Sequence, residues 1–177
     1  MKKSYKALVS DAAVFAAGNM LTKLIQFLLL PMYTALLTTE QYGIGELVNN
    51  TAELLYPLCC LGVYEGVFRF SIDRDSDNKA VFSTGISIAL FLLPVVAAAG
   101  IFGYSFTGFD YTWQLVILCF ITSFKVICLQ FSKGIGKTRL YASSGVLGAL
   151  TLFCAGYLFL GVFGMGVNGY LLALILS

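Results

Sequence analysis

Residues 80–104, AVFSTGISIALFLLPVVAAAGIFGY, form an apolar segment without a charged side chain. A helix of roughly 20 such residues crosses the hydrocarbon core of a bilayer. Similar segments recur along the sequence, whose 177 residues are 59% hydrophobic and only 11% charged, against about 25% charged residues in an average soluble domain. The composition therefore argues against a soluble protein and predicts an integral membrane protein.

Six hydrophobic segments, separated by polar or turn-forming stretches, define the expected organisation. The last segment stops at Ser177 after about ten residues and is too short to span a bilayer. We expect an all-α, polytopic transmembrane helix bundle with five full spans and a truncated sixth, in a single domain over residues 1–177. Either the chain is a fragment or its end is unusual. The segments cover residues 7–34, 43–70, 80–104, 113–133, 141–162 and 167 onward.

The positions of Lys and Arg predict a cytoplasmic N-terminus, because cytoplasmic loops carry an excess of these residues. The expected outer loops contain neither, and only Lys23 and Lys125 lie inside helices. The start MKKSYKALVSDAAVFAAG could pass for a signal peptide, but Asp11 interrupts its apolar run, so we interpret it as a retained first helix. The other basic residues lie on the expected cytoplasmic side: Lys2, Lys3, Lys6, Arg69, Arg74, Lys79, Lys133, Lys137 and Arg139.

No pattern in the sequence indicates an enzyme, a metal site or a nucleic-acid partner. GIGKT at 134–138 lacks the first glycine of a phosphate-binding loop, and Asp73, Asp75 and Asp77 lack the glycine and glutamate of a calcium loop. We interpret both stretches as cytoplasmic loops. There is no histidine, and the five cysteines lie in apolar runs without CxxC spacing, so we expect small packed residues there.

Small residues and prolines within the segments predict local features of the bundle. Small residues spaced four apart allow close helix packing, and prolines within or near helix ends can kink helices. The pairs are Gly62/Gly66, Ser144/Gly148 and Gly145/Ala149, and the prolines are Pro31, Pro57 and Pro94.

The segment 43–70 carries an unexpected polar face. Within GELVNNTAELLY (45–56), four polar residues follow one another at i, i+3, i+4 and i+7, which places them on one side of a helix. A charged side chain in the hydrocarbon costs about 2.5–3.5 kcal/mol and usually faces a cavity or a partner. The residues are Glu46, Asn49, Asn50 and Glu53, and a continuous helix would extend their face to Pro57, Cys60 and Tyr64.

Two further helices bring polar groups to a similar expected depth. Asn19, Lys23 and Gln26 share a face of the first helix, and Lys125 lies in the fourth. We predict a water-filled cavity whose lysines attract an anionic group such as a phosphate. The alternative is structural ion pairing, for instance between Lys23 and Glu53. No bound cofactor is expected, although a carboxylate could couple transport to a proton or a sodium ion.

The stretch PMYTALLTTEQYGIGELV (31–48) resembles the first-loop signature of polysaccharide export proteins, in which a P-x-x-T-x-x-L-like run precedes E-x-Y-G. GVYEGVFRF (62–70) is similar to that family's end of the second helix. These proteins are lipid-linked oligosaccharide flippases of the multidrug/oligosaccharidyl-lipid/polysaccharide superfamily. The resemblance implies the N-terminal lobe of a two-lobe, MATE-like transporter, with Lys23 and Lys125 as cationic cavity residues.

The implied function is alternating access that moves an undecaprenyl-pyrophosphate-linked glycan to the outer leaflet of the bacterial cytoplasmic membrane. The implied partners are the bilayer, this lipid-linked substrate, a C-terminal lobe, and polysaccharide polymerase or glycosyltransferase machinery. One alternative is a cation-coupled multidrug exporter of the same superfamily, which mid-membrane carboxylates would favour. Another is a non-transporting membrane scaffold or assembly partner, whose polar residues would be fully paired.

Overall fold

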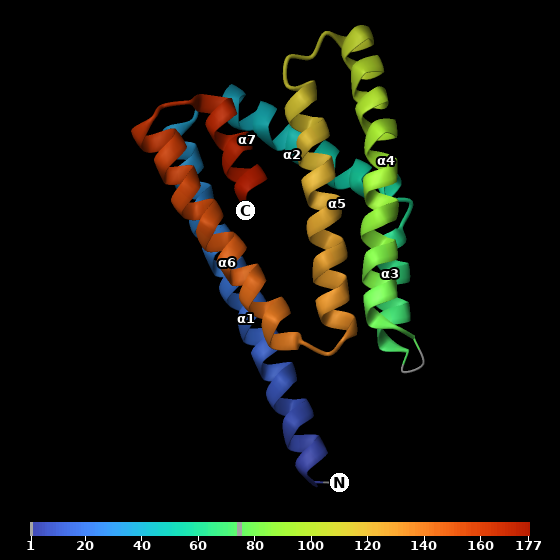
Figure 1. Cartoon of the computed structure of the whole chain (residues 1–177). Helices are drawn as coiled ribbons and strands as arrows, with labels where there is room; N and C mark the ends of the chain where they lie inside the picture. Colours follow the sequence, from blue (N-terminus) through green and yellow to red (C-terminus); the bar gives the residue numbers. More distant parts are fainter. Residues whose placement is uncertain (1, 74–75) are drawn as a thin grey trace. The chain divides into compact units, whose positions relative to one another are not determined.

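The computed structural model describes residues 2–73 and 76–177, and every regular element in this part of the chain is a helix (Figure 1). The predicted all-α fold is thus confirmed. Arg74 and Asp75, two of the expected loop residues, lie outside the described residues. The elements are α1 (Lys2–Leu36), α2 (Thr39–Cys59), α3 (Val63–Ile72), α4 (Asn78–Thr107), α5 (Thr112–Gly134), α6 (Thr138–Gly156), the π-helical turn η1 (Tyr157–Val162) and α7 (Gly166–Leu176).

Four helical stretches are long and apolar enough to cross a membrane. They agree with four of the predicted segments, and α6 continues into η1 to complete the last of them. The shorter α7 is also apolar, but it has only 11 residues. The four stretches are Ala12–Leu36, Asn78–Ser105, Thr112–Gly134 and Thr138–Val162.

The chain divides into two compact units. Unit 1 comprises residues 1–43 and 137–177 and therefore contains α1, the start of α2, α6, η1 and α7. Unit 2 comprises residues 44–136 and contains the rest of α2 together with α3, α4 and α5.

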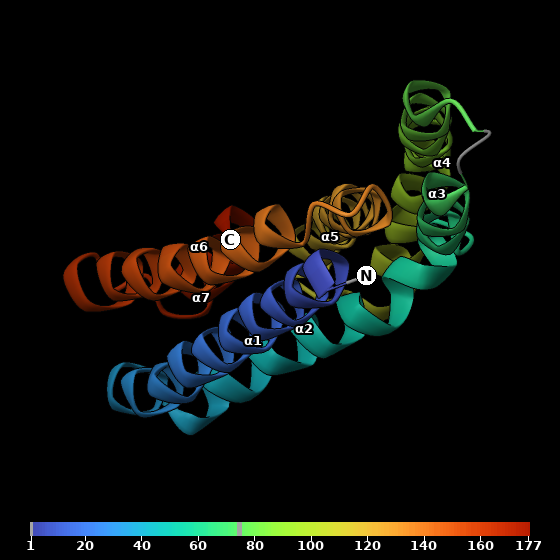
Figure 2. The same cartoon turned by 90° about the horizontal axis from the view of Figure 1, so that it is seen from below.

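In unit 1, α1 and α6 lie side by side and run in the same direction (Figures 1 and 2). The ring of Phe15 in α1 stacks on that of Tyr141 near the start of α6, with centroids 5.4 Å apart. A Cβ added to Gly18 would come within 2.8 Å of the Ala142 Cβ, so the absence of a side chain at this position permits the approach. The parallel direction is the one expected for the first and fifth spans of an alternating topology.

In unit 2, α3, α4 and α5 pack around a small apolar core of Val67, Ala89 and Ile127, and Ile127 is completely buried. A Cβ at Gly85 would lie 2.5 Å from the Val67 Cγ2 atom, so this glycine lets α4 approach α3 closely. The rings of Phe82 in α4 and Phe131 in α5 are 4.7 Å apart. Because early residues of α4 meet late residues of α5, these two helices are antiparallel, again as alternation requires.

The predicted packing pair Gly62/Gly66 is wrong, because a Cβ at either position would meet nothing within 4 Å. The pair Gly145/Ala149 is confirmed as part of a packed face. Ala149 is buried, and a Cβ at Gly145 would lie 3.5 Å from the Thr22 hydroxyl oxygen of α1. A four-residue spacing of small residues therefore identifies a close contact only where a neighbouring helix faces it.

The continuous helix predicted over residues 43–70 is also wrong, because α2 ends at Cys59 and α3 begins at Val63. The Gly62 amide donates to the Pro57 carbonyl and the Leu61 amide to the Leu58 carbonyl, which is the Schellman pattern of a helix end. Leu61 and Gly62 adopt left-handed φ values of 48° and 66°. The expected extension of the polar face to Cys60 and Tyr64 on one helix therefore does not exist.

The turn between α1 and α2 is held by a reciprocal pair of hydrogen bonds. The Gln41 amide donates to the Thr38 hydroxyl oxygen, and the Thr38 amide donates to the Gln41 side-chain carbonyl, which forms a capping box. Beside it, Tyr170 of α7 contacts Tyr33 and Tyr42, with ring centroids 4.9 Å and 6.2 Å away. Residues of the 31–48 signature thus stabilise the connection between α1 and α2 and contact α7.

Gly85→Ala should destabilise unit 2, whereas Gly66→Ala should not. The first change forces a methyl group into the stiff Val67 side chain, and such overpacking costs about 1–3 kcal/mol. The second adds a methyl group in open space. Thermal unfolding of both variants in the same detergent measures the difference, and equal melting temperatures would contradict the glycine contact.

Leu61→Gly should be neutral or stabilising, because it relieves a left-handed residue whose side chain is 72% exposed. Gly62→Val should instead lower stability by about 1–2 kcal/mol, the usual cost of a side chain in this region. Unfolding of the two variants in parallel is the measurement. A more stable Gly62→Val variant would show that the chain does not break here.

Candidate functional site

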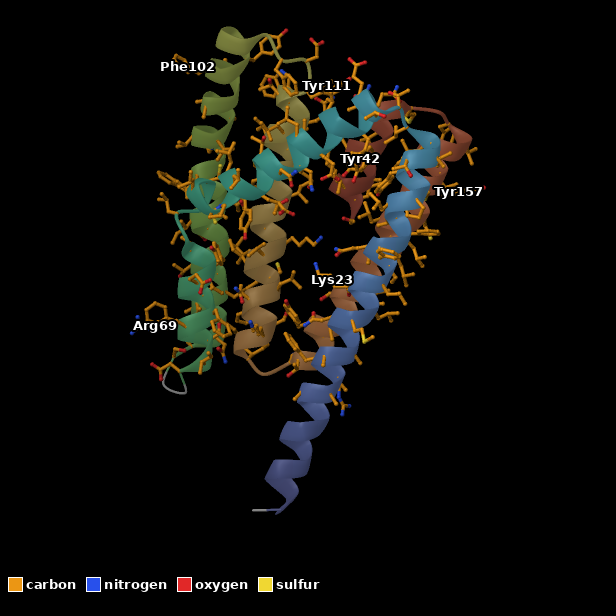
Figure 3. The ribbon with its side chains drawn as sticks, turned by 180° about the vertical axis from the view of Figure 1, so that it is seen from behind. Lys23, Tyr42, Arg69, Phe102, Tyr111 and Tyr157 are labelled. Atoms are coloured by element: carbon orange, nitrogen blue, oxygen red, sulfur yellow. The ribbon has the colours of Figure 1, made fainter. Side chains whose placement is uncertain are left out.

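The polar residues of α1 occupy a stripe of their own. Gly18 and Thr22 face α6, whereas Asn19, Lys23 and Gln26 lie about 100° further round the helix and are exposed. Figure 3 shows the Lys23 side chain projecting from α1. A third face is apolar and exposed, and it is the face suited to lipid: Met20 (78%), Leu24 (56%) and Phe27 (71%).

The part of α2 that belongs to unit 2, residues 44–59, repeats this arrangement. Its buried face consists of Gly45, Val48 and Ala52, and the Ala52 carbonyl accepts a hydrogen bond from the Cys119 thiol of α5 at 3.9 Å. On the polar face, Asn50 and Glu53 are exposed, and the other two predicted residues, Glu46 and Asn49, are half-buried. The exposed apolar face carries Leu47 (58%), Leu54 (75%) and Leu58 (70%).

Lys125 lies on α5 away from the core of unit 2. The buried residues Cys119, Ser123 and Ile127 follow one side of α5, and helical geometry places Lys125 about 160–240° round the helix from them. Lys125 is exposed, as expected for a residue outside the core.

Hydroxyl groups in the apolar helices bond to their own backbone, whereas most residues of the polar stripes form no such bond in the described part of the chain. The Thr22 hydroxyl donates to the Gly18 carbonyl at 2.9 Å, and the Ser123 hydroxyl donates to the Cys119 carbonyl at 2.8 Å. Among the described residues of their own units, most of the predicted cavity residues form neither a hydrogen bond nor an ion pair. These are Asn19, Lys23, Gln26, Asn49, Asn50, Glu53 and Lys125.

The predicted site residues therefore fall into two groups. Unit 1 brings Asn19, Lys23 and Gln26 together on α1, and unit 2 holds the four residues of α2 and Lys125. Glu53 and Lys125 form no ion pair within unit 2. Both the grouping of the two sets around one cavity and the alternative pairing of Lys23 with Glu53 stay predictions.

The break after α2 creates a cluster that sequence reasoning missed. The rings of Tyr56 and Tyr64 lie 5.9 Å apart, and Tyr56 is close enough to Glu53 and Glu65 to interact electrostatically with both carboxylates. On a continuous helix Glu65 would point away from the polar stripe. The signal for this cluster was Pro57 followed by Gly62, which together favour the end of a helix.

The cysteines contribute packing rather than a metal centre in the described part of the chain. No group of three or more His, Cys, Asp or Glu side chains there could hold a metal ion. All five cysteines are free thiols, and Cys60 and Cys119 are buried as predicted, but Cys154 is exposed. The Cys59 thiol at the end of α2 lies close to the Cys119 thiol of α5.

The fold and these stripes define a helical protein with at least four helices suited to a membrane and with polar side chains left unpaired among them. No family model, no curated protein and no solved structure matches this chain.

Asn50→Cys and Glu46→Cys should react with a membrane-impermeant thiol reagent in intact cells, because the polar stripe is expected to meet water. Leu54→Cys, one turn further along α2, should not react, because its face is expected to meet lipid. Asp110→Cys in the connection between α4 and α5 should react and shows that the reagent reaches the outer side. The unmodified chain, with its exposed Cys154, sets the background. Labelling at position 110 but not at position 46 or 50 would indicate a buried stripe.

Proposed function

We propose that this chain is the N-terminal lobe of an exporter that moves a lipid-linked oligosaccharide or polysaccharide precursor across the bacterial cytoplasmic membrane. The observation that supports this most is the set of unpaired amide and charged side chains on otherwise apolar helices. A bilayer offers such groups no partner, and they are retained where they line a water-filled path or meet a polar substrate. On α1 and α2 they lie apart from both the packing face and the exposed apolar face.

The charges favour an anionic substrate group. Lys23 and Lys125 carry cationic side chains without a carboxylate partner among the described residues of their own units. A pyrophosphate that links a lipid to a glycan supplies the negative charge that two ammonium groups attract. Glu53 is the candidate for coupling transport to a proton or a sodium ion.

In this proposal, α2 and α3 together form a broken second span, and α7 is the first part of the sixth. Helices interrupted within the membrane are a feature of transporters, in which the unwound residues lie beside a cavity. The N-terminus lies in the cytoplasm, and alternating access requires a second lobe. Polysaccharide polymerase or glycosyltransferase machinery would be the neighbouring partner.

The resemblance of residues 31–48 to the polysaccharide-export signature supports the assignment of this chain to an N-terminal transporter lobe. It says less about which substrate is moved. Thr38, Gln41 and Tyr42 take part in the turn between α1 and α2 or in its contact with α7. These residues stabilise the connection between the helices. In this proposal the polar stripes of α1 and α2 recognise the substrate.

A cation-coupled exporter is the second candidate, because Glu53 and Glu65 flank the Tyr56 and Tyr64 rings. Carboxylates beside aromatic faces suit an organic cation, since both attract positive charge. For this candidate Glu53→Gln is the damaging change, and the two lysines are dispensable.

Lys23→Ala and Lys125→Ala in the full-length protein should each reduce glycan export about tenfold or more. Interactions of charged groups are worth about 1.5–3 kcal/mol, and each 1.4 kcal/mol corresponds to about a factor of ten. The measurement is the amount of surface glycan in cells that depend on this protein, normalised to its level in the membrane. Lys137→Ala, at the exposed start of α6, is the matched control and should export normally.

The outcome of this experiment separates the candidate functions. Normal export in both lysine variants rejects the anionic-lipid proposal, and a loss confined to Glu53→Gln favours the cation-coupled exporter. If every variant exports normally while the protein remains required for assembly of the glycan machinery, the chain is a scaffold.

A further inference from the structure

One end of the α4–α5 pair carries exposed aromatic side chains that also have polar groups. Trp113 in the first turn of α5 is 49% exposed, and Tyr104 in the last turn of α4 is 47% exposed. Figure 3 shows Phe102 and Tyr111 at the same end of these two helices. Among the described residues of unit 2, neither the Trp113 indole N–H nor the Tyr104 hydroxyl has a hydrogen-bond partner. Both groups therefore need a partner outside this unit.

The surroundings that the chain requires change within a few residues at this end. Asp110, in the connection between α4 and α5, is exposed, and its carboxylate requires water. Ile117, one turn beyond Trp113, is 46% exposed on a helix suited to cross a membrane, so its side chain requires apolar surroundings. Trp113 lies between them, where the chain passes from water to hydrocarbon. An indole suits this position because its ring is apolar while its N–H needs an acceptor.

The length of α5 agrees with this position of Trp113. The exposed Lys133 in the last turn of α5 lies twenty residues further along the chain, which corresponds to about 30 Å of helix. The hydrocarbon core of a bilayer has about the same thickness. With Trp113 at one boundary of this core, Lys133 therefore lies at the other. The segment between them contains one charged residue, Lys125.

We propose that Trp113 and Tyr104 anchor the α4–α5 pair in the glycerol-ester region of one membrane leaflet, where lipid ester carbonyls accept hydrogen bonds from the indole N–H and the phenol O–H. Hydrocarbon offers these donors no acceptor, and an unpaired donor there is costly. With a cytoplasmic N-terminus this leaflet is the outer one. The anchor does not depend on the proposed export function. It places Lys125 about 18 Å from the level of Trp113, in the half of the membrane nearer to Lys133.

The sequence contains a single tryptophan, so the fluorescence of the unmodified full chain reports the depth of Trp113 without any substitution. The chain is reconstituted into phosphatidylcholine vesicles whose lipids carry bromine, which quenches a nearby tryptophan. The bromine is placed either near the glycerol esters or near the ends of the acyl chains. Bromine near the esters should quench Trp113 about twofold more strongly than bromine near the chain ends, because tryptophan rings in membrane proteins sit at the interface.

Two variants move the probe. Trp113→Phe with Phe124→Trp is the matched control, because it shifts the tryptophan about 16 Å along α5 to an exposed position within the hydrocarbon. There the bromine near the chain ends should quench more strongly. Trp113→Phe with Tyr104→Trp should reproduce the quenching pattern of the unmodified chain.

Three results for the unmodified chain would overturn the proposal. Stronger quenching by bromine near the chain ends would show that hydrocarbon surrounds the Trp113 ring. Quenching by aqueous iodide alone would show that the ring lies in water. Protection from iodide and from both bromine positions would show that protein, such as a second copy of the chain, covers the ring.

Discussion

In a hydrocarbon environment every backbone amide and carbonyl must find its partner within the protein, and the rest of this structure follows from that constraint. It makes every regular element of the described chain a helix, and it requires a specific bonding pattern wherever a helix stops. The Schellman bonds at Leu61 and Gly62 satisfy the carbonyls at the end of α2. At the start of α2, Thr38 and Gln41 satisfy amides by their reciprocal hydrogen bonds.

The same constraint separates two kinds of polar side chain. Ser and Thr hydroxyls reach the carbonyl one turn earlier and become internally satisfied, as Thr51 does at the Leu47 carbonyl and Ser132 at the Cys128 carbonyl. Longer amide and charged side chains, such as those of Lys23 and Glu53, have no equivalent partner on their own helix. Their presence among leucines therefore indicates an environment other than lipid, and the proposed function depends on this distinction.

Much of the fold could be predicted from the sequence because hydrophobic length and helical periodicity are local properties. The apolar segments, the directions of the helices and the stripe from Glu46 to Glu53 all follow from them. The end of α2 was not predicted because leucine rarely adopts the left-handed backbone conformation that Leu61 has. Gly62 and Gly66 suggested a packing motif, but whether a glycine meets a neighbour depends on tertiary contacts, as at Gly85. For the same reason, the proximity of Glu65 to Tyr56 emerged only in three dimensions.

Unit 1 is formed by two separate stretches of the sequence, and this affects the order in which the chain can fold during its synthesis. Residues 44–136 of unit 2 are contiguous, so its three-helix core can assemble as soon as α5 has left the ribosome. The contact between Gly18 of α1 and Ala142 of α6, by contrast, can form only after Ala142 is synthesised, more than a hundred residues later. During that interval most of α1 lacks its main neighbour, α6, and the membrane covers its apolar side chains. Translation thus imposes an order in which the middle of the chain folds before its beginning.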